Sequence, residues 1–289
     1  MGRARESRRA PARTDTGVQP GVYPIDTGTC ELIRDSLSDD GWIVKINGVE
    51  SSHIDVDDPA RLDFEYMRWT ARLVEEAFEG RARLRVLHLG GGVCTLARHV
   101  AAVRPDARQL VVEIDGRLAE LAREWFDLPR APALRIRVGD ARAVTESLTE
   151  SSRDVVVRDV FAGAVTPRAL TTVEFTRHVG RVLGDDGLYV VNCGDTRDLR
   201  GARREAATIG SVFAHTAIVA DPAMLKGRRY GNIVIAGSAR PIGESPALVR
   251  DLLQGAVPAH VWTDARVREF VGTSAPLTDA ELEPGELLG

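Results

Sequence analysis

The sequence predicts an α/β protein with a mostly parallel sheet covered by helices on both faces. From residue 84 to residue 236, short apolar runs typical of buried strands alternate with amphipathic runs typical of helices. Three glycines follow the first of these strands, and the composition is that of a globular protein, with 44% hydrophobic and 28% charged residues. A chain of 289 residues can bury a sizeable core without a disulfide or metal staple.

Seven segments are expected to form the strands of this sheet. They are residues 84–89, 109–114, 134–138, 154–159, 188–193, 217–220 and 232–236, and helical patterns lie at 62–78, 94–103, 117–126, 171–183 and 198–209. No obvious helix joins the last two strands, which indicates an antiparallel pair. The layout resembles the class I S-adenosylmethionine-methyltransferase-like fold, which has a seven-stranded Rossmann-like sheet.

The segments on either side of this pattern differ from it in composition. Residues 1–20 contain five arginines and two acids without an apolar period, which predicts a disordered tail. Residues 21–60 contain short strand-like runs separated by turn signals such as Asn47-Gly48, which predict a small antiparallel cap. We therefore expect a nucleoside-binding catalytic domain at 61–240 and a Pro-rich, acidic C-terminal extension at 241–289 packed on its outside.

Charge and apolar pattern exclude several classes of protein. The 38 basic and 42 acidic residues give a net charge of −4, which argues against a nucleic-acid partner. No apolar stretch approaches the roughly 20 residues that cross a bilayer, so no membrane partner is expected. The three cysteines are widely spaced and suggest neither a disulfide framework nor a metal site. No apolar stretch of a secretory signal follows the N-terminus, and we expect a cytoplasmic protein.

The strand ends carry the strongest functional signal. Gly90-Gly91-Gly92 separates a strand from a helix, where glycines let the backbone approach a ligand closely. Glu113 ends the next strand, 21 positions after Gly92, near the spacing at which an acid accepts both ribose hydroxyls. Gly139-Asp140 follows the third strand, where the carboxylate can accept from an adenine amino group. All three turns should meet at the carboxyl edge of the sheet and form a nucleoside site.

Over residues 28–240 the chain resembles the spermidine synthase family, the polyamine aminopropyltransferases, and in particular its divergent spermidine-synthase-like bacterial branch. The motifs that carry the resemblance are Asn47-Gly48-Val49 in the cap, Asp63-Phe64-Glu65-Tyr66 for the family's E-F-x-Y, the three glycines with Glu113-Ile114-Asp115 for GGGDGG and EID, Gly139-Asp140 for GDG, and the run from Asp154 to Asp159 for D-x-x-D-P.

The resemblance implies both ligands and roles. The co-substrate would be decarboxylated S-adenosylmethionine, or S-adenosylmethionine itself, and a homodimer would pass its aminopropyl group to a small amine. Nucleoside binding would involve Gly90, Gly91, Gly92, Glu113, Asp115, Gly139 and Asp140, with Glu113 on the ribose and Asp140 on the adenine. Asp159 would be the first acid of the catalytic loop, and Tyr66 would help to position the amine.

Two departures from the family pattern bear on the reaction. Val93 stands where the family has the aspartate that meets the ammonium of the aminopropyl group, and Ala162 stands where it has the second acid of the catalytic loop. Asp159 is then the candidate base, and Asp195, after the fifth strand, is a candidate replacement charge. Arg158 would favour an anionic or neutral acceptor if it pointed into the pocket, whereas pointing away it would pair with a surface acid.

Three functions therefore remain open on the sequence. The first is aminopropyl transfer, which the motifs favour. The second is methyl transfer or another reaction of S-adenosylmethionine, which the loss of an acid at Val93 favours. The third is a non-catalytic homologue that binds a nucleoside or a partner protein, which the absence of both family acids favours.

Overall fold

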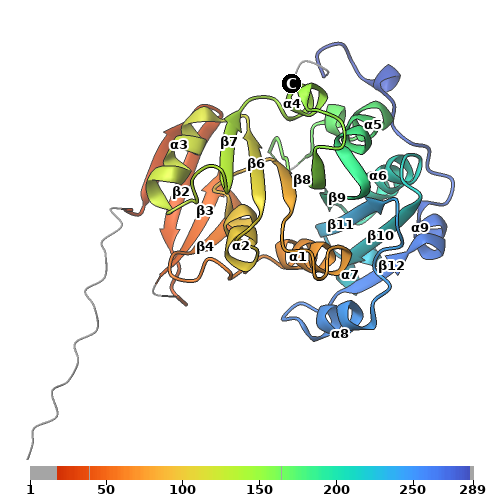
Figure 1. Cartoon of the computed structure of the whole chain (residues 1–289), viewed down its shortest axis with the longest axis horizontal. Helices are drawn as coiled ribbons and strands as arrows, with labels where there is room; N and C mark the ends of the chain where they lie inside the picture. Colours follow the sequence, from red (N-terminus) through yellow and green to blue (C-terminus); the bar gives the residue numbers. More distant parts are fainter. Residues whose placement is uncertain (1–17, 39, 164, 287–289) are drawn as a thin grey trace, which may run out of the picture.

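Two sheets organise the chain. The computed structural model describes residues 18–38, 40–163 and 165–286, so residues 1–17 of the tail expected at 1–20 lie outside the described residues. A four-stranded sheet in the order β1-β2-β3-β4 lies beside an eight-stranded sheet in the order β12-β10-β11-β9-β8-β5-β6-β7 (Figure 1). The α/β architecture with a small N-terminal β cap is the one that the sequence predicts.

The cap is an antiparallel meander of β1 (Gly21–Ile25), β2 (Gly28–Arg34), β3 (Gly41–Ile46) and β4 (Val49–Asp55). Asn47 and Gly48 join the last two strands with φ of 51° and 80°, the left-handed backbone that a tight hairpin turn requires. One face of the meander buries Leu32, Trp42 and Val44 in a core shared with α2 and α3. The cap is therefore fixed to the larger unit by apolar packing.

The large sheet contains all seven expected strands. Five run parallel: β5 (Arg85–Leu89), β6 (Arg108–Glu113), β7 (Leu134–Val138), β8 (Arg153–Arg158) and β9 (Leu183–Asp195). As expected, β10 (His215–Ala220) and β11 (Gly231–Ser238) pair antiparallel. The expected count of seven is corrected to eight, because β12 (His260–Thr263) adds an edge strand from the C-terminal extension. Four residues are too few for a clear period in the sequence.

Helices cover both faces of this sheet, as Figure 1 shows. They are α1 (Glu65–Ala77), α2 (Thr95–Val103), α3 (Gly116–Trp125), α4 (Ala141–Ser147), α5 (Val173–Val182), α6 (Arg200–Gly210), α7 (Pro222–Leu225), α8 (Pro246–Gln254) and α9 (Asp264–Val271). The sequence predicts α1, α2, α3, α5 and α6. The sequence analysis did not predict α4, α7, α8 and α9, of which α4 and α7 have only seven and four residues.

The carboxyl ends of the parallel strands lie along one edge of the sheet. Three backbone hydrogen bonds fix the turns there: Gly90 N–H to the Val112 carbonyl at 2.9 Å, Gly139 N–H to the Glu113 carbonyl at 2.9 Å, and Asp159 N–H to the Leu89 carbonyl at 2.8 Å. The turns after β5, β6 and β8 are thus neighbours, as a site at this edge requires.

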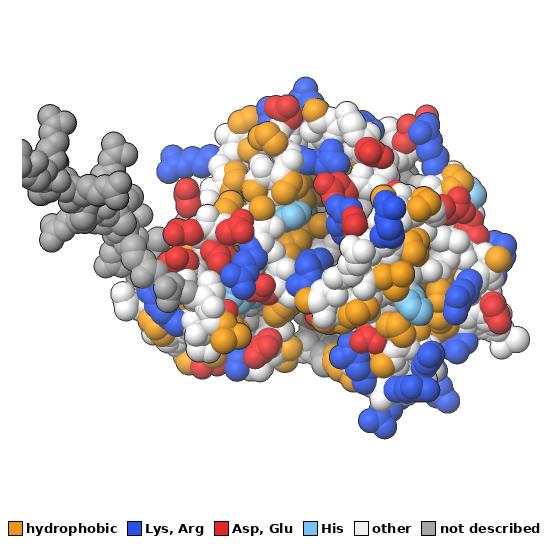
Figure 2. Space-filling model, turned by 90° about the horizontal axis from the view of Figure 1, so that it is seen from below, with side chains coloured by type: hydrophobic (Ala, Val, Ile, Leu, Met, Phe, Trp, Pro, Cys, Tyr) orange, Lys and Arg blue, Asp and Glu red, His pale blue; other side chains and the backbone are white. Residues whose placement is uncertain are grey.

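The described surface mixes side chains of both charges with apolar ones. Figure 2 shows this on the face seen from below, where basic and acidic side chains lie among exposed hydrophobic residues. Among the helices of the described residues, none is both long and apolar enough to span a bilayer.

Candidate active site

The glycine turn after β5 is held by the carboxylate of Glu113. The N–H groups of Gly91 and Gly92 both donate to Glu113 Oε2 at 2.9 Å. Gly90 has a φ of 84°, and a Cβ added to it would lie 2.1 Å from the carbonyl oxygen of Asp159. Only glycine fits this close approach of two backbones, which brings the turn beside the first residue after β8.

Two further acids of the nucleoside motif begin helices. Asp140 Oδ1 accepts the Ala143 N–H at 2.7 Å and so caps α4. Asp115 Oδ1 accepts the Leu118 N–H at 2.7 Å at the start of α3, while its Oδ2 accepts the N–H and hydroxyl of Thr27 at 2.7 and 2.8 Å. Burial would raise the pKa of Asp115, but these hydrogen bonds prevail and lower it. Asp115 therefore links the cap to α3, whereas Glu113 and Asp140 follow neighbouring strands at the carboxyl edge.

The carboxylate of Asp159 is held by two buried side chains from other elements. Tyr66, in the first turn of α1, donates its hydroxyl to Asp159 Oδ2 at 2.9 Å, and Asn192 on β9 donates its amide to Oδ1 at 3.0 Å. Burial raises the pKa of Asp159, and the hydrogen bonds from Asn192 and Tyr66 oppose this shift only partly. Burial and the Asp159 charge also raise the pKa of Tyr66 well above 10, so its hydroxyl stays protonated and donates.

Asn192 is a site residue that the sequence analysis missed. It is 4% exposed, and its Oδ1 has no hydrogen-bond partner among the residues that the structure describes. A buried carbonyl oxygen without a donor is rare, and here it belongs to the amide group that holds Asp159. The signal was present, since Asn192 lies near the carboxyl end of a predicted strand, but the charged Asp195 three residues later was chosen instead.

Among the described residues, Asp195 and Arg158 form no hydrogen bond or ion pair with the Asp159 carboxylate. Asp195 accepts the N–H groups of Thr196 and Ala202, both at 2.7 Å, at the start of α6. Arg158 is fully buried and forms an ion pair of 2.6 Å with Glu205 of α6. Of the two sequence-based alternatives for Arg158, the one in which it points away and pairs with an acid is therefore confirmed, but the acid, Glu205, is buried and does not lie on the surface. The reason is strand alternation, which turns Arg158 to the opposite face of the sheet from Asp159.

The two positions that depart from the family pattern carry no acid. Val93 is 0% exposed and packs in the core between the cap, α2 and α3. Ala162 is exposed, and its N–H donates to the Val165 carbonyl at 2.9 Å in the loop after β8. Asp159, at the start of this loop, does carry a carboxylate.

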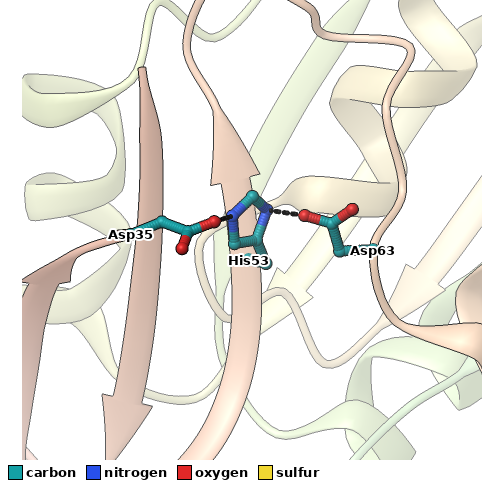
Figure 3. A group of neighbouring side chains, drawn as sticks. All are labelled: Asp35, His53 and Asp63. Carbon is teal, nitrogen blue, oxygen red and sulfur yellow. Dashed lines mark hydrogen bonds and ion pairs between the residues drawn. The ribbon is translucent and has the colours of Figure 1, made fainter. Parts of the chain in front are cut away.

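A second polar cluster joins the cap to the segment before α1. The Nε2 atom of His53 lies 3.0 Å from Asp35 Oδ2, and its Nδ1 atom lies 2.6 Å from Asp63 Oδ2. The two ring nitrogens point in opposite directions (Figure 3), so one metal ion cannot be bound by both. The cluster acts as a hydrogen-bonded link, and it holds Asp63 three residues before Tyr66.

Known proteins of similar sequence and structure indicate the family of the chain. The crystal structure of a probable spermidine synthase from Corynebacterium glutamicum is 49% identical, has a TM-score of 0.88 and covers 92% of this chain and 98% of its own. The chain belongs to the spermidine synthase family. The membership predicted from the motifs is confirmed, although no family model matches the chain.

Two further relatives match a smaller part of this chain. A polyamine aminopropyltransferase of Vibrio vulnificus is 31% identical over 53% of this chain and 50% of its own. An N-terminal histidine N-methyltransferase of Emericella nidulans is 30% identical over 55% of this chain and 29% of its own. The chain thus spans half or less of the length of these two proteins. The spermidine synthase of Thermotoga maritima, 17% identical over 87% of both chains with a TM-score of 0.62, shares the fold.

Proposed function

We propose that the protein transfers the aminopropyl group of decarboxylated S-adenosylmethionine to a small amine. The observation that carries the proposal is the Asp159 carboxylate, held by Tyr66 and Asn192 directly beside the glycine turn. In this proposal Asp159 is a base next to the site where the nucleoside would bind. Membership of the spermidine synthase family supports the same reaction.

In this proposal the two sides of the site have different tasks. The glycine turn and Glu113 bind the ribose, and Asp140 binds the adenine. Tyr66 and Asn192 orient Asp159, whereas the Asp195 carboxylate holds the start of α6.

The proposed reaction needs a base because alkyl amines titrate near 10 and are protonated at neutral pH. The amine nitrogen, once neutral, attacks the methylene carbon beside the sulfonium. The carbon–sulfur bond breaks, its electron pair goes to sulfur, and methylthioadenosine leaves. The proton of the attacking amine passes to Asp159, whose raised pKa makes it a stronger base than an ordinary aspartate.

The test is formation of methylthioadenosine by the purified protein from decarboxylated S-adenosylmethionine and a series of small amines. Product that depends on the acceptor, and that falls sharply in Asp159→Asn, supports the proposal. Absence of product with every amine at high enzyme concentration rejects it.

A second candidate, methyl transfer, is favoured by the environment of Val93. Its side chain is buried in the core, so the glycine turn provides no carboxylate there for the ammonium of an aminopropyl donor. Calorimetry separates the candidates. Tighter binding of S-adenosylmethionine than of its decarboxylated form favours methyl transfer, and the reverse order favours aminopropyl transfer.

A further inference from the structure

Two loops meet at the carboxyl end of β9, close to Asn192. Residues 196–199 follow β9, and residues 226–230 precede β11, whose first residue Gly231 pairs with Asp195. A Cβ added to Gly227 would lie 2.4 Å from the carbonyl oxygen of Arg197. The two loops are therefore in backbone contact and form one surface, here named the β9 rim.

The β9 rim adjoins the acceptor side of the proposed site. A Cβ added to Gly194 would lie 3.3 Å from the ring of Phe161 and 3.4 Å from the hydroxyl of Tyr230. Phe161 follows Asp159 by two residues, and Gly194 follows Asn192 by two. Phe161 and Tyr230 are 36% and 58% exposed. The surface that starts at Asp159 and Asn192 thus continues over Gly194 onto the rim.

The charge of the β9 rim is strongly positive. Arg197, Lys226, Arg228 and Arg229 belong to its two loops, and Arg200 follows the first loop at the start of α6; all five are exposed. Arg229 pairs with Asp221 at 2.7 Å, and Arg200 pairs with Asp198 at 3.4 Å. The remaining three have no carboxylate partner within the described part of the chain. Lys226 is one of only two lysines in the sequence.

We infer that the acceptor is an amine that carries an anionic group at its other end, and not a diamine. The inference rests on the proposed function and specifies its substrate. At the inner end, the Asp159 carboxylate and the unpartnered Asn192 Oδ1 both accept hydrogen bonds, so they suit the N–H groups of an amine.

At the outer end, Arg197, Lys226 and Arg228 attract a carboxylate and repel a second ammonium. Like charges placed opposite one another at a binding surface disfavour the wrong ligand. The basic rim therefore selects the acceptor by charge, while Asp159 selects it by hydrogen bonding.

The experiment compares two acceptors of equal chain length, 4-aminobutanoate and 1,4-diaminobutane. With decarboxylated S-adenosylmethionine as donor, we expect methylthioadenosine to form with a higher kcat/KM for 4-aminobutanoate. The combined variant Arg197→Gln, Lys226→Gln, Arg228→Gln should reduce that preference by about tenfold, since each removed charge contributes a fraction of this factor near a wet surface. Added salt should reduce the preference of the unaltered protein in the same direction.

Arg135→Gln is the matched control, because Arg135 is exposed on β7, four strands away from β9. It should leave the preference unchanged. A preference for the diamine, or a preference that the triple variant does not alter, overturns the inference while leaving the proposed transfer intact.

Failure of the proposed transfer is distinguishable from failure of this inference. If neither acceptor yields methylthioadenosine, calorimetry with methylthioadenosine-loaded protein compares the binding of the two compounds without turnover. Tighter binding of 4-aminobutanoate, lost in the triple variant, supports the inference. Equal, weaker or absent binding rejects it.

Discussion

The two sides of the proposed site, one for the nucleoside and one for the acceptor, hold their acids in different ways. On the nucleoside side, Glu113 and Asp140 accept hydrogen bonds from backbone N–H groups of turns and helix starts. On the acceptor side, Asp159 accepts from two side chains, Tyr66 and Asn192, which are 93 and 33 residues away in the sequence. The first arrangement fixes the backbone of the turns, whereas the second sets the position and basicity of a single carboxylate.

The largest effect is expected from Asp159→Asn on the acceptor side. This change keeps the size of the side chain and removes the proton acceptor, so we expect kcat for methylthioadenosine formation to fall by about 10²–10⁴-fold. Binding of methylthioadenosine should change little, because Glu113 and the glycine turn are unaltered. Asp106→Asn is the control, since Asp106 is exposed and precedes β6 at the opposite edge of the sheet. Retained turnover in Asp159→Asn would remove Asp159 from the role of base.

The second effect concerns the stability of the scaffold beneath the acceptor side. Glu205→Gln leaves the fully buried Arg158 guanidinium without its counter-charge, which should lower the free energy of unfolding by about 3–5 kcal/mol. Urea denaturation measures this decrease in the free energy of unfolding. The exposed pair of Arg240 and Asp186, 2.5 Å apart, provides the comparison, because Arg240→Gln should cost only about 0–1 kcal/mol. If both variants lowered the free energy of unfolding equally, burial would not be what makes the Arg158–Glu205 pair important for stability.

The same contrast explains how much the sequence could predict. Glu113 and the glycines were found because local spacing along β5 and β6 places them, and the parallel sheet follows from the alternation of strands and helices. The position of Asn192 near the end of a predicted strand was visible, but its contact with Asp159 depends on the pairing of β8 with β9, which the sequence does not show. The burial of Arg158 depends on Glu205, 47 positions later, which no local pattern connects to it.

The nucleoside side can be tested with two neighbouring acids. Glu113→Gln removes the charge that we propose binds the ribose, and hydrogen bonds to charged groups contribute about 1.5–3 kcal/mol. Affinity for methylthioadenosine should therefore fall by roughly tenfold to a hundredfold in calorimetry. Asp115→Asn should leave that affinity nearly unchanged and lower stability instead, because the Asp115 carboxylate binds Thr27 and the start of α3. An equal loss of affinity in both variants would contradict this division of roles.

The smallest effect should come from Tyr66→Phe, and it appears in the pH profile. The Tyr66 hydroxyl donates to Asp159 and lowers the pKa of that carboxyl against the effect of burial. Without the hydroxyl the pKa rises further, so a larger fraction of Asp159 is protonated at a given low pH and cannot act as base. The acid limb of kcat/KM should move to higher pH, and the rate loss, about threefold to tenfold near the limb, should shrink as the pH rises. Tyr23→Phe, which removes a hydroxyl bonded to the Gln19 carbonyl in the cap, should leave the limb in place. If kcat/KM in Tyr66→Phe fell by the same factor at every pH, the tyrosine would position the substrate without changing the pKa of Asp159.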